Sequence, residues 1–238
     1  MKEEIKTERT SAQSGTHGLN ARKIASIAMF CAIAYVVVCI SKLIPVNVAG
    51  FLNLDFKDVV IVIGGLILGP LPAVFISAFV SLVEMLTISS TGPVGLLMNV
   101  LSTCAFACPA AILYQHRAKF SRAVVGLVTG VLLMTVVMML WNYLITPLYM
   151  GVSRDVVASM LLPVFLPFNL LKGGMNAALT ILFYKPIINA LRAAKLVPSH
   201  EKTGGELKGS RSKLGVIILA LVVVVTCALL LLVMSGII

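Results

Sequence analysis

Long apolar segments constrain this chain of 238 residues more than any other feature. Hydrophobic residues make up 59% of the sequence, charged residues only 12%, and the mean hydropathy is +1.05. The apolar segments show no strand-like alternation. Lipid offers no partner to backbone N–H and C=O groups, so each segment must pair these groups within itself, as an α-helix does. The sequence therefore predicts an all-α integral membrane protein and excludes a soluble domain.

Seven apolar spans are expected. The second and third lie within residues 59–83, which could form either one kinked helix or two short ones. Residues 59–83 are continuously apolar but contain Gly69, Pro70 and Pro72, which end or kink a helix. With two helices here and the N-terminus inside, fifteen basic residues lie on the inner side against Lys42, Lys57 and Arg154 outside. The positive-inside rule favours this split, although a helix over 58–69 is only about 18 Å long and must be shielded by its neighbours. The other spans are expected at about 24–42, 94–115, 124–148, 159–191 and 214–238.

These spans predict four parts of the chain. Residues 1–20 are polar and are expected to form a disordered cytoplasmic tail. Residues 21–195 form a six-helix membrane domain, 196–213 a cytoplasmic linker, and 214–238 an additional transmembrane helix that leaves the C-terminus extracellular. The basic residues flank the spans, where they orient the chain and attract anionic lipid, so no nucleic-acid partner is expected.

Lys172 lies alone in the apolar stretch 161–184, with no carboxylate nearby in sequence. A cation at membrane depth costs about 2.5–3.5 kcal/mol on insertion scales and usually faces a cavity or a partner. Asn169, Lys172 and Asn176 are spaced three and four residues apart, which places them on one face of a helix. We expect this face to line a binding cavity; the alternative is that Lys172 extends to the lipid headgroups.

Further candidate site residues, most of them polar, are expected at a similar depth on the outer side. They come from other spans and from the apolar loop that follows the first span: Glu84, Asn99, Asn142, Phe51, Asn53, Leu54 and Asp55. Polar groups from several spans beneath one loop indicate a pocket that opens to the outside. The alternative is that each Asn makes an interhelical hydrogen bond and that Glu84 ends its helix in water.

The sequence lacks the motifs of an enzyme. It contains no phosphate-binding glycine loop, no His-Glu-x-x-His and no Ser/His/Asp set, and its three histidines fall in predicted tails or loops. The five cysteines lie within apolar spans, which predicts neither a disulfide framework nor a metal site. We therefore expect no catalysis, no metal and no cofactor.

Small residues mark one face of the first span. Ala21 and Ala25, like Ala28 and Ala32, have the small-x-x-x-small spacing that lets another helix approach closely. This helix could belong to a partner or to the bundle itself.

Several motifs occur in an order that resembles a known family. They are Gly50–Val59, Gly64–Pro70, Gly92–Asn99, Asn169–Asn176 and Tyr184–Pro186. Over residues 21–195 the chain resembles the substrate-binding S components of energy-coupling-factor (ECF) vitamin transporters, most closely the riboflavin-specific branch. The long N-terminal tail and the seventh span depart from the six-helix pattern of this family.

The resemblance implies a six-helix bundle in the bacterial cell membrane that binds riboflavin, or the related flavin FMN, from outside. It implies a membrane T component and two cytoplasmic ATPases as partners, with Ala25, Ala28 and Ala32 facing the T component. Asn169 and Lys172 are then the foremost flavin-binding candidates. Asn142, Glu84, Asn99 and the Phe51–Asp55 loop follow.

Two other functions remain open at this point. One is an S component for another vitamin, such as folate or thiamine. The other is a self-sufficient secondary transporter that uses Glu84 or Asp58 as a proton carrier, although the sequence shows no inverted repeat and no buried acidic relay.

Overall fold

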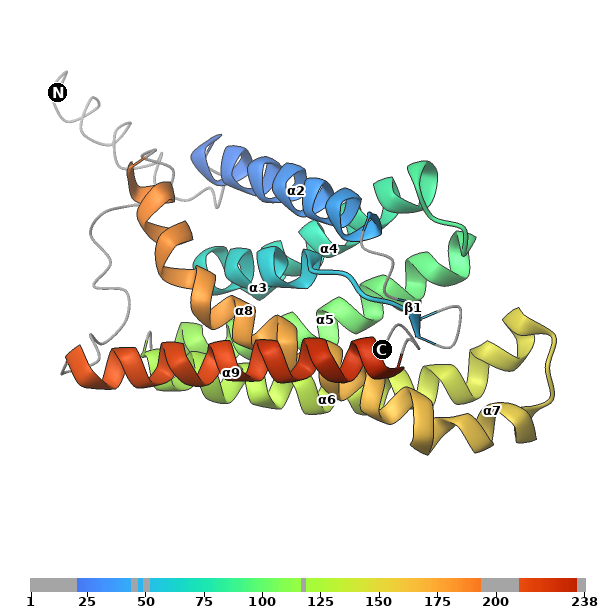
Figure 1. The fold of residues 1–238 in the computed structure, drawn as a ribbon. Coiled ribbons are helices and arrows are strands. Elements are labelled where there is room, and N and C mark those ends of the chain that lie inside the picture. Colours follow the sequence, from blue (N-terminus) through green and yellow to red (C-terminus); the bar gives the residue numbers. More distant parts are fainter. Residues whose placement is uncertain (1–20, 44–46, 49–51, 117–118, 194–209, 235–238) are drawn as a thin grey trace, which may run out of the picture.

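Figure 1 shows the computed structural model, a bundle of helices with one small hairpin near one end. The structure describes residues 21–43, 47–48, 52–116, 119–193 and 210–234. The helices are α2 (Ala21–Lys42), α3 (Lys57–Leu68), α4 (Pro70–Thr87), α5 (Gly92–His116), α6 (Phe120–Met150), α7 (Arg154–Met160), α8 (Leu166–Ala193) and α9 (Ser210–Met234). A π-helical turn, η1 (Leu161–Phe165), joins α7 to α8.

The hairpin lies in the loop between α2 and α3. Strand β1 (Asn47–Val48) pairs antiparallel with β2 (Leu52–Asn53), with Asn47 opposite Asn53. This short pairing is the one departure from the predicted all-α chain within the described residues. We call the end of the bundle that carries it the hairpin end.

The predicted division of residues 59–83 is confirmed. Helix α3 ends at Leu68, Gly69 follows with a φ of +107°, and Pro70 begins α4. A positive φ is open to glycine, and the missing N–H of proline is harmless in the first helical turn. Helix α3 has 12 residues, ten of them buried, and packs against α2, α4, α5 and α8. The neighbours therefore supply the shielding that so short a helix needs.

Five helices in the described residues are long and apolar enough to cross a membrane. They are α2, α4, α5, α6 and the continuous segment from α7 through α8, while Ile218–Met234 in α9 is a shorter apolar stretch. With the short α3, this arrangement agrees with six bundle helices and one additional helix. Residues 1–20 and 194–209, the predicted tail and most of the predicted linker, lie outside the described residues, and α9 begins four residues before the predicted span.

Helices α5 and α6 pack most closely where α6 carries Gly126 and Gly130. A Cβ atom on Gly130 would overlap the carbonyl oxygen of Phe106, and one on Gly126 would lie 2.7 Å from the Cα of Ala110. Both contacts are to backbone, which cannot move aside as a side chain can. The Gly-x-x-x-Gly spacing therefore sets the distance between the two helices.

The turn η1 sets the start of α8. Pro163 lies within it and has no N–H, so the α-helical hydrogen bond from residue 163 to residue 159 cannot form. Such π turns shift the register of the following residues and are frequent at functional sites. Helix α8 starts directly after this shift, three residues before Asn169.

Substitution of Gly130 by alanine should lower the apparent Tm of the purified protein by several degrees. The added methyl group forces α5 and α6 apart, and overpacking of this kind costs about 1–3 kcal/mol. Gly215 in α9 is the matched control, because a Cβ there meets no atom within 4 Å. An equal Tm for Gly130→Ala and Gly215→Ala would contradict the close contact.

Candidate ligand-binding site

A polar pocket lies at the hairpin end. It is enclosed by the helices α2, α4, α5, α6 and α8 and by the loop that joins α2 to α3. Eight of the nine residues predicted from the sequence line it: Asn53, Leu54, Asp55, Glu84, Asn99, Asn142, Asn169 and Lys172. The ninth, Phe51, lies outside the described residues. The structure thus brings together side chains that are up to 119 positions apart in the sequence, from Asn53 to Lys172.

Lys172 forms an ion pair with Asp55 across the pocket. Its Nζ atom donates to Oδ2 of Asp55 at 2.8 Å, and each residue is only 8% exposed. Asn176, one turn further along α8, donates to the backbone oxygen of Asp55 at 3.4 Å. The polar face of α8 therefore holds the loop that leads into α3, and Lys172 points into the bundle rather than to the headgroups.

The Asp55 carboxyl lies in this loop, outside the membrane-spanning helices. Burial alone would raise its pKa, but Lys172, followed by Lys57 and Lys42, holds the pKa below its usual value. Asp55 is therefore an anion at neutral pH.

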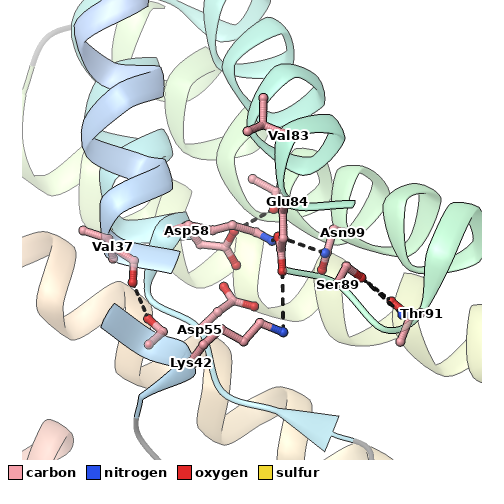
Figure 2. A network of polar contacts seen from close by, with 12 residues as sticks. Val37, Lys42, Asp55, Asp58, Val83, Glu84, Ser89, Thr91 and Asn99 are labelled. Atoms are coloured by element: carbon pink, nitrogen blue, oxygen red, sulfur yellow. Dashed lines mark hydrogen bonds and ion pairs between the residues drawn. The ribbon is translucent and has the colours of Figure 1, made fainter. Parts of the chain in front are cut away.

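Glu84 is the second centre of charge. Figure 2 shows Lys42 and Asn99 reaching it from different sides. Lys57 Nζ donates to its Oε2 at 2.6 Å, Asn99 Nδ2 donates to the same oxygen at 3.3 Å, and Lys42 Nζ lies 3.8 Å from Oε1. Glu84 is 4% exposed, so it does not end its helix in water as the alternative interpretation held.

The charge count from the sequence placed Lys57 among the basic residues on the outer side and did not predict its burial. Lys57 is 1% exposed and begins α3 inside the bundle, where Glu84 neutralises it. A buried charge is retained when it is paired and hydrogen-bonded. The signal was present in the sequence: Asp55, Lys57 and Asp58 lie together at the start of a helix too short to cross the membrane.

Two amide side chains of the pocket bond to backbone carbonyls four residues earlier in the chain. Asn169 Nδ2 donates to the Phe165 carbonyl at 2.8 Å, and Asn142 Nδ2 donates to the Met138 carbonyl at 2.7 Å. Thr146 Oγ1 donates to Oδ1 of Asn142 at 2.9 Å. Each of these amides has hydrogen-bonding capacity beyond these contacts, because an amide carries two N–H donors and an oxygen with two lone pairs.

Sequence reasoning missed the other polar lining of the pocket. Ser41 and Lys42 come from the end of α2, and Ser89, Ser90 and Thr91 come from the turn between α4 and α5. Ser89 and Thr91 are hydrogen-bonded through their hydroxyl groups at 2.9 Å. Apolar walls are provided by Met98, Met138 and Phe168.

The chemistry of the pocket lining suits the binding of a neutral solute. Its charged lining groups are balanced: Lys42 and Lys172 face Asp55 and Glu84. Among the described residues, no three His, Cys, Asp or Glu side chains are grouped so that they could hold a metal ion. Amides, hydroxyls and paired charges beside apolar walls suit a neutral ligand with a polar edge.

The cavity has a volume of about 70 Å³. Sites for small organic ligands usually measure about 300–1,000 Å³. In this conformation the loop residues Leu52–Asp55 and the charged side chains of Glu84 and Lys172 line a narrow cavity, and we call this conformation closed.

The predicted partner-facing alanines lie on a different surface. Ala25, Ala28 and Ala32 all belong to α2, and all three are exposed. Ala28 and Ala32 line an apolar groove of about 420 Å³ between α2 and α4, whose other wall includes Phe75 and Phe79. These alanines are therefore not used to pack α2 within the described bundle.

Comparison with known proteins matches this architecture to one family. The family model described as "ECF transporter, substrate-specific component" matches residues 22–184. The chain is 27% identical to the riboflavin transporter FmnP of Bacillus subtilis (strain 168) over 190 residues, which covers 75% of this chain and all of that protein. It is 28% identical to the riboflavin transporter RibU of Staphylococcus aureus (strain TCH60) over 177 residues, which covers 72% of this chain and 93% of the relative.

A solved structure of the S component of a bacterial ECF transporter supports the same assignment. It superimposes with a TM-score of 0.61 at 28% identity, covering 73% of this chain and 98% of the other. The family match spans the helices that build the pocket, from α2 to most of α8. The chain therefore belongs to the substrate-specific S components of ECF transporters, a family of multi-pass membrane proteins that are not enzymes.

Proposed function

We propose that this S component captures riboflavin from outside the cell and delivers it inward together with a T component and two cytoplasmic ATPases. The observation that carries the proposal is the convergence of Asn142, Asn169 and Lys172 on one pocket with apolar walls. The relatives described as riboflavin transporters support this choice of substrate. The hairpin end then faces outward and the N-terminus lies in the cytoplasm, in agreement with the distribution of basic residues.

The chemistry of the pocket fits a flavin. A flavin has a flat apolar ring system, an edge of carbonyl and imide groups, and a chain of hydroxyls. Amides such as Asn142 and Asn169 offer donors and acceptors to the imide edge, the Lys172 ammonium can donate to a ring carbonyl, and Glu84 can accept from hydroxyls. Phe168 and the two methionines offer apolar contact to the ring faces.

Binding requires the closed pocket to open. A flavin cannot enter a cavity of about 70 Å³, so the loop residues Leu52–Asp55 must move away from α8. Lys172 then exchanges the Asp55 carboxylate for an acceptor on the ligand, and the loop covers the bound vitamin afterwards. Exchange of one partner for another avoids the cost of leaving the buried ammonium unpaired.

The balanced charge of the lining groups favours riboflavin, which is neutral, over FMN, which carries a phosphate. FMN and other vitamins are the alternatives. Purification without added ligand separates them: a yellow protein that releases riboflavin supports the proposal, and a folded protein that binds no flavin contradicts it.

The groove between α2 and α4 is the proposed contact for the T component. It combines Ala28 and Ala32 with apolar side chains of α4, which suits close packing against a helix of another membrane protein.

Substitution of Lys172 by alanine should weaken riboflavin binding about ten- to hundredfold, because a hydrogen bond to a charged group contributes about 1.5–3 kcal/mol. Titration of riboflavin fluorescence with purified protein measures the change. Lys185→Ala is the matched control, since Lys185 is an exposed residue of the same helix. The double variant Lys172→Ala/Asp55→Asn removes the unpaired carboxylate that the single change leaves behind. Wild-type affinity in both variants would remove Lys172 from the site.

Substitution of Ala28 by tryptophan should abolish riboflavin uptake by cells that contain the complete transporter, while riboflavin binding by the purified S component stays unchanged. The bulky ring fills the groove that the partner helix needs. Ile33→Trp, at an exposed position of α2 outside the groove, should leave uptake intact. Loss of uptake in both variants, or in neither, would argue against this groove as the docking surface.

A further inference from the structure

Helix α9 lies beyond residue 184, where the family match ends. It packs along α8, the helix that carries Asn169 and Lys172. Ala220 and Leu231 of α9 are buried, at 5% and 1% exposure, while most of its other described residues are exposed or partly exposed. The helix therefore has one face against the protein and the rest toward lipid.

Two different faces of α8 serve the site and α9. Asn169, Lys172 and Asn176 form the polar face that points to the pocket and to Asp55. Gly174 lies on another face, where an added Cβ would be 3.8 Å from the sulfur of Cys227 in α9. Leu171 and Met175 belong to the apolar cluster that also contains Leu231. Helix α8 is thus held between the ligand pocket and α9.

This apolar cluster reaches the pocket itself. It includes Leu52 of the hairpin and Phe168 of α8, and both of these line the pocket. From α9 it contains Cys227, Ala228, Leu231 and Met234. Because protein interiors are close-packed, the positions of the pocket-wall side chains depend on the residues packed behind them. The last two turns of α9 therefore support a wall of the ligand site.

The position of α9 leaves the proposed docking groove free. Figure 1 shows α9 and α2 on opposite sides of the bundle. The alanines of α2 and the groove beside them are consequently not covered by α9. A role of α9 in covering this groove is incompatible with the structure.

We propose that α9 is a positioning element for the ligand site, a fixed brace that holds Phe168 in the apolar wall and supports Leu52 when the loop covers the bound ligand. This inference rests on the proposed riboflavin-binding function. Without the brace, the wall is in the binding-competent arrangement for a smaller fraction of the time. The apparent Kd rises in inverse proportion to that fraction.

Leu231→Ala tests the brace in the full-length protein. The lost side chain leaves a cavity in the cluster, and we expect the Kd for riboflavin to rise about three- to tenfold, mainly through faster dissociation. Leu229→Ala removes the same atoms from an exposed position, 53% accessible, and should bind as the wild type does. Leu231→Met keeps the volume and should restore affinity.

A reversible cross-link tests whether α9 stays in place. In Gly174→Cys, the new thiol faces the native Cys227, and oxidation should join α8 to α9. Riboflavin affinity should be the same before and after reduction. Gly174→Cys/Cys227→Ala, which cannot form this bond, controls for the new side chain.

The outcomes separate the two proposals. No riboflavin binding by the wild type contradicts the proposed function. Binding by the wild type with equal affinities of Leu231→Ala and Leu229→Ala contradicts the brace. Binding that is lost on oxidation and regained on reduction shows that α9 must move, which also overturns the brace.

Discussion

The ion pair between Lys172 and Asp55 is the interaction on which the described arrangement depends. An unpaired ammonium in the middle of an apolar helix would be driven toward water or lipid headgroups. With Asp55 at 2.8 Å, it can face the interior, and α8 is tied to the loop that precedes α3. Lys57 and Glu84 do the same for α3 and α4 at 2.6 Å. The two pairs let a set of polar side chains exist inside a bundle whose outer surface is apolar.

These ion pairs both stabilise the closed pocket and oppose its opening for a ligand. While the pocket is closed, each buried charge is neutralised by its partner, and the short distance between the partners keeps the site narrow. A ligand competes with those contacts and must supply equivalent ones. Neutral hydrogen-bonding groups on a flat ring can do so without adding charge, whereas a doubly charged ligand would disturb the balance of two cations and two anions that line the cavity.

Local signals in the sequence were sufficient for the helices and for most of the pocket lining. Gly69 and Pro70 act on their own neighbours, so the break between α3 and α4 could be predicted from composition and charge. The polar residues of the pocket stood out because each interrupts an apolar span. Partner choice could not be predicted in the same way, since Lys172 and Asp55 are 117 positions apart and pair only after α8 has packed against the loop. The burial of Lys57 and the close approach of α5 to Gly126 and Gly130 likewise depend on which helices become neighbours.

The short length of α3 determines how far a bound solute lies from the opposite end of the bundle. Its first residue, Lys57, is bonded to Glu84 in the pocket wall, and its last, Leu68, completes a helix of only 12 residues. At 1.5 Å per residue, the Lys57–Glu84 pair is about 18 Å from the opposite end of α3, whereas a hydrocarbon core measures about 30 Å. In the proposed orientation, with Leu68 toward the cytoplasm, a solute bound beside this pair has less than the full thickness of the hydrocarbon core left to cross.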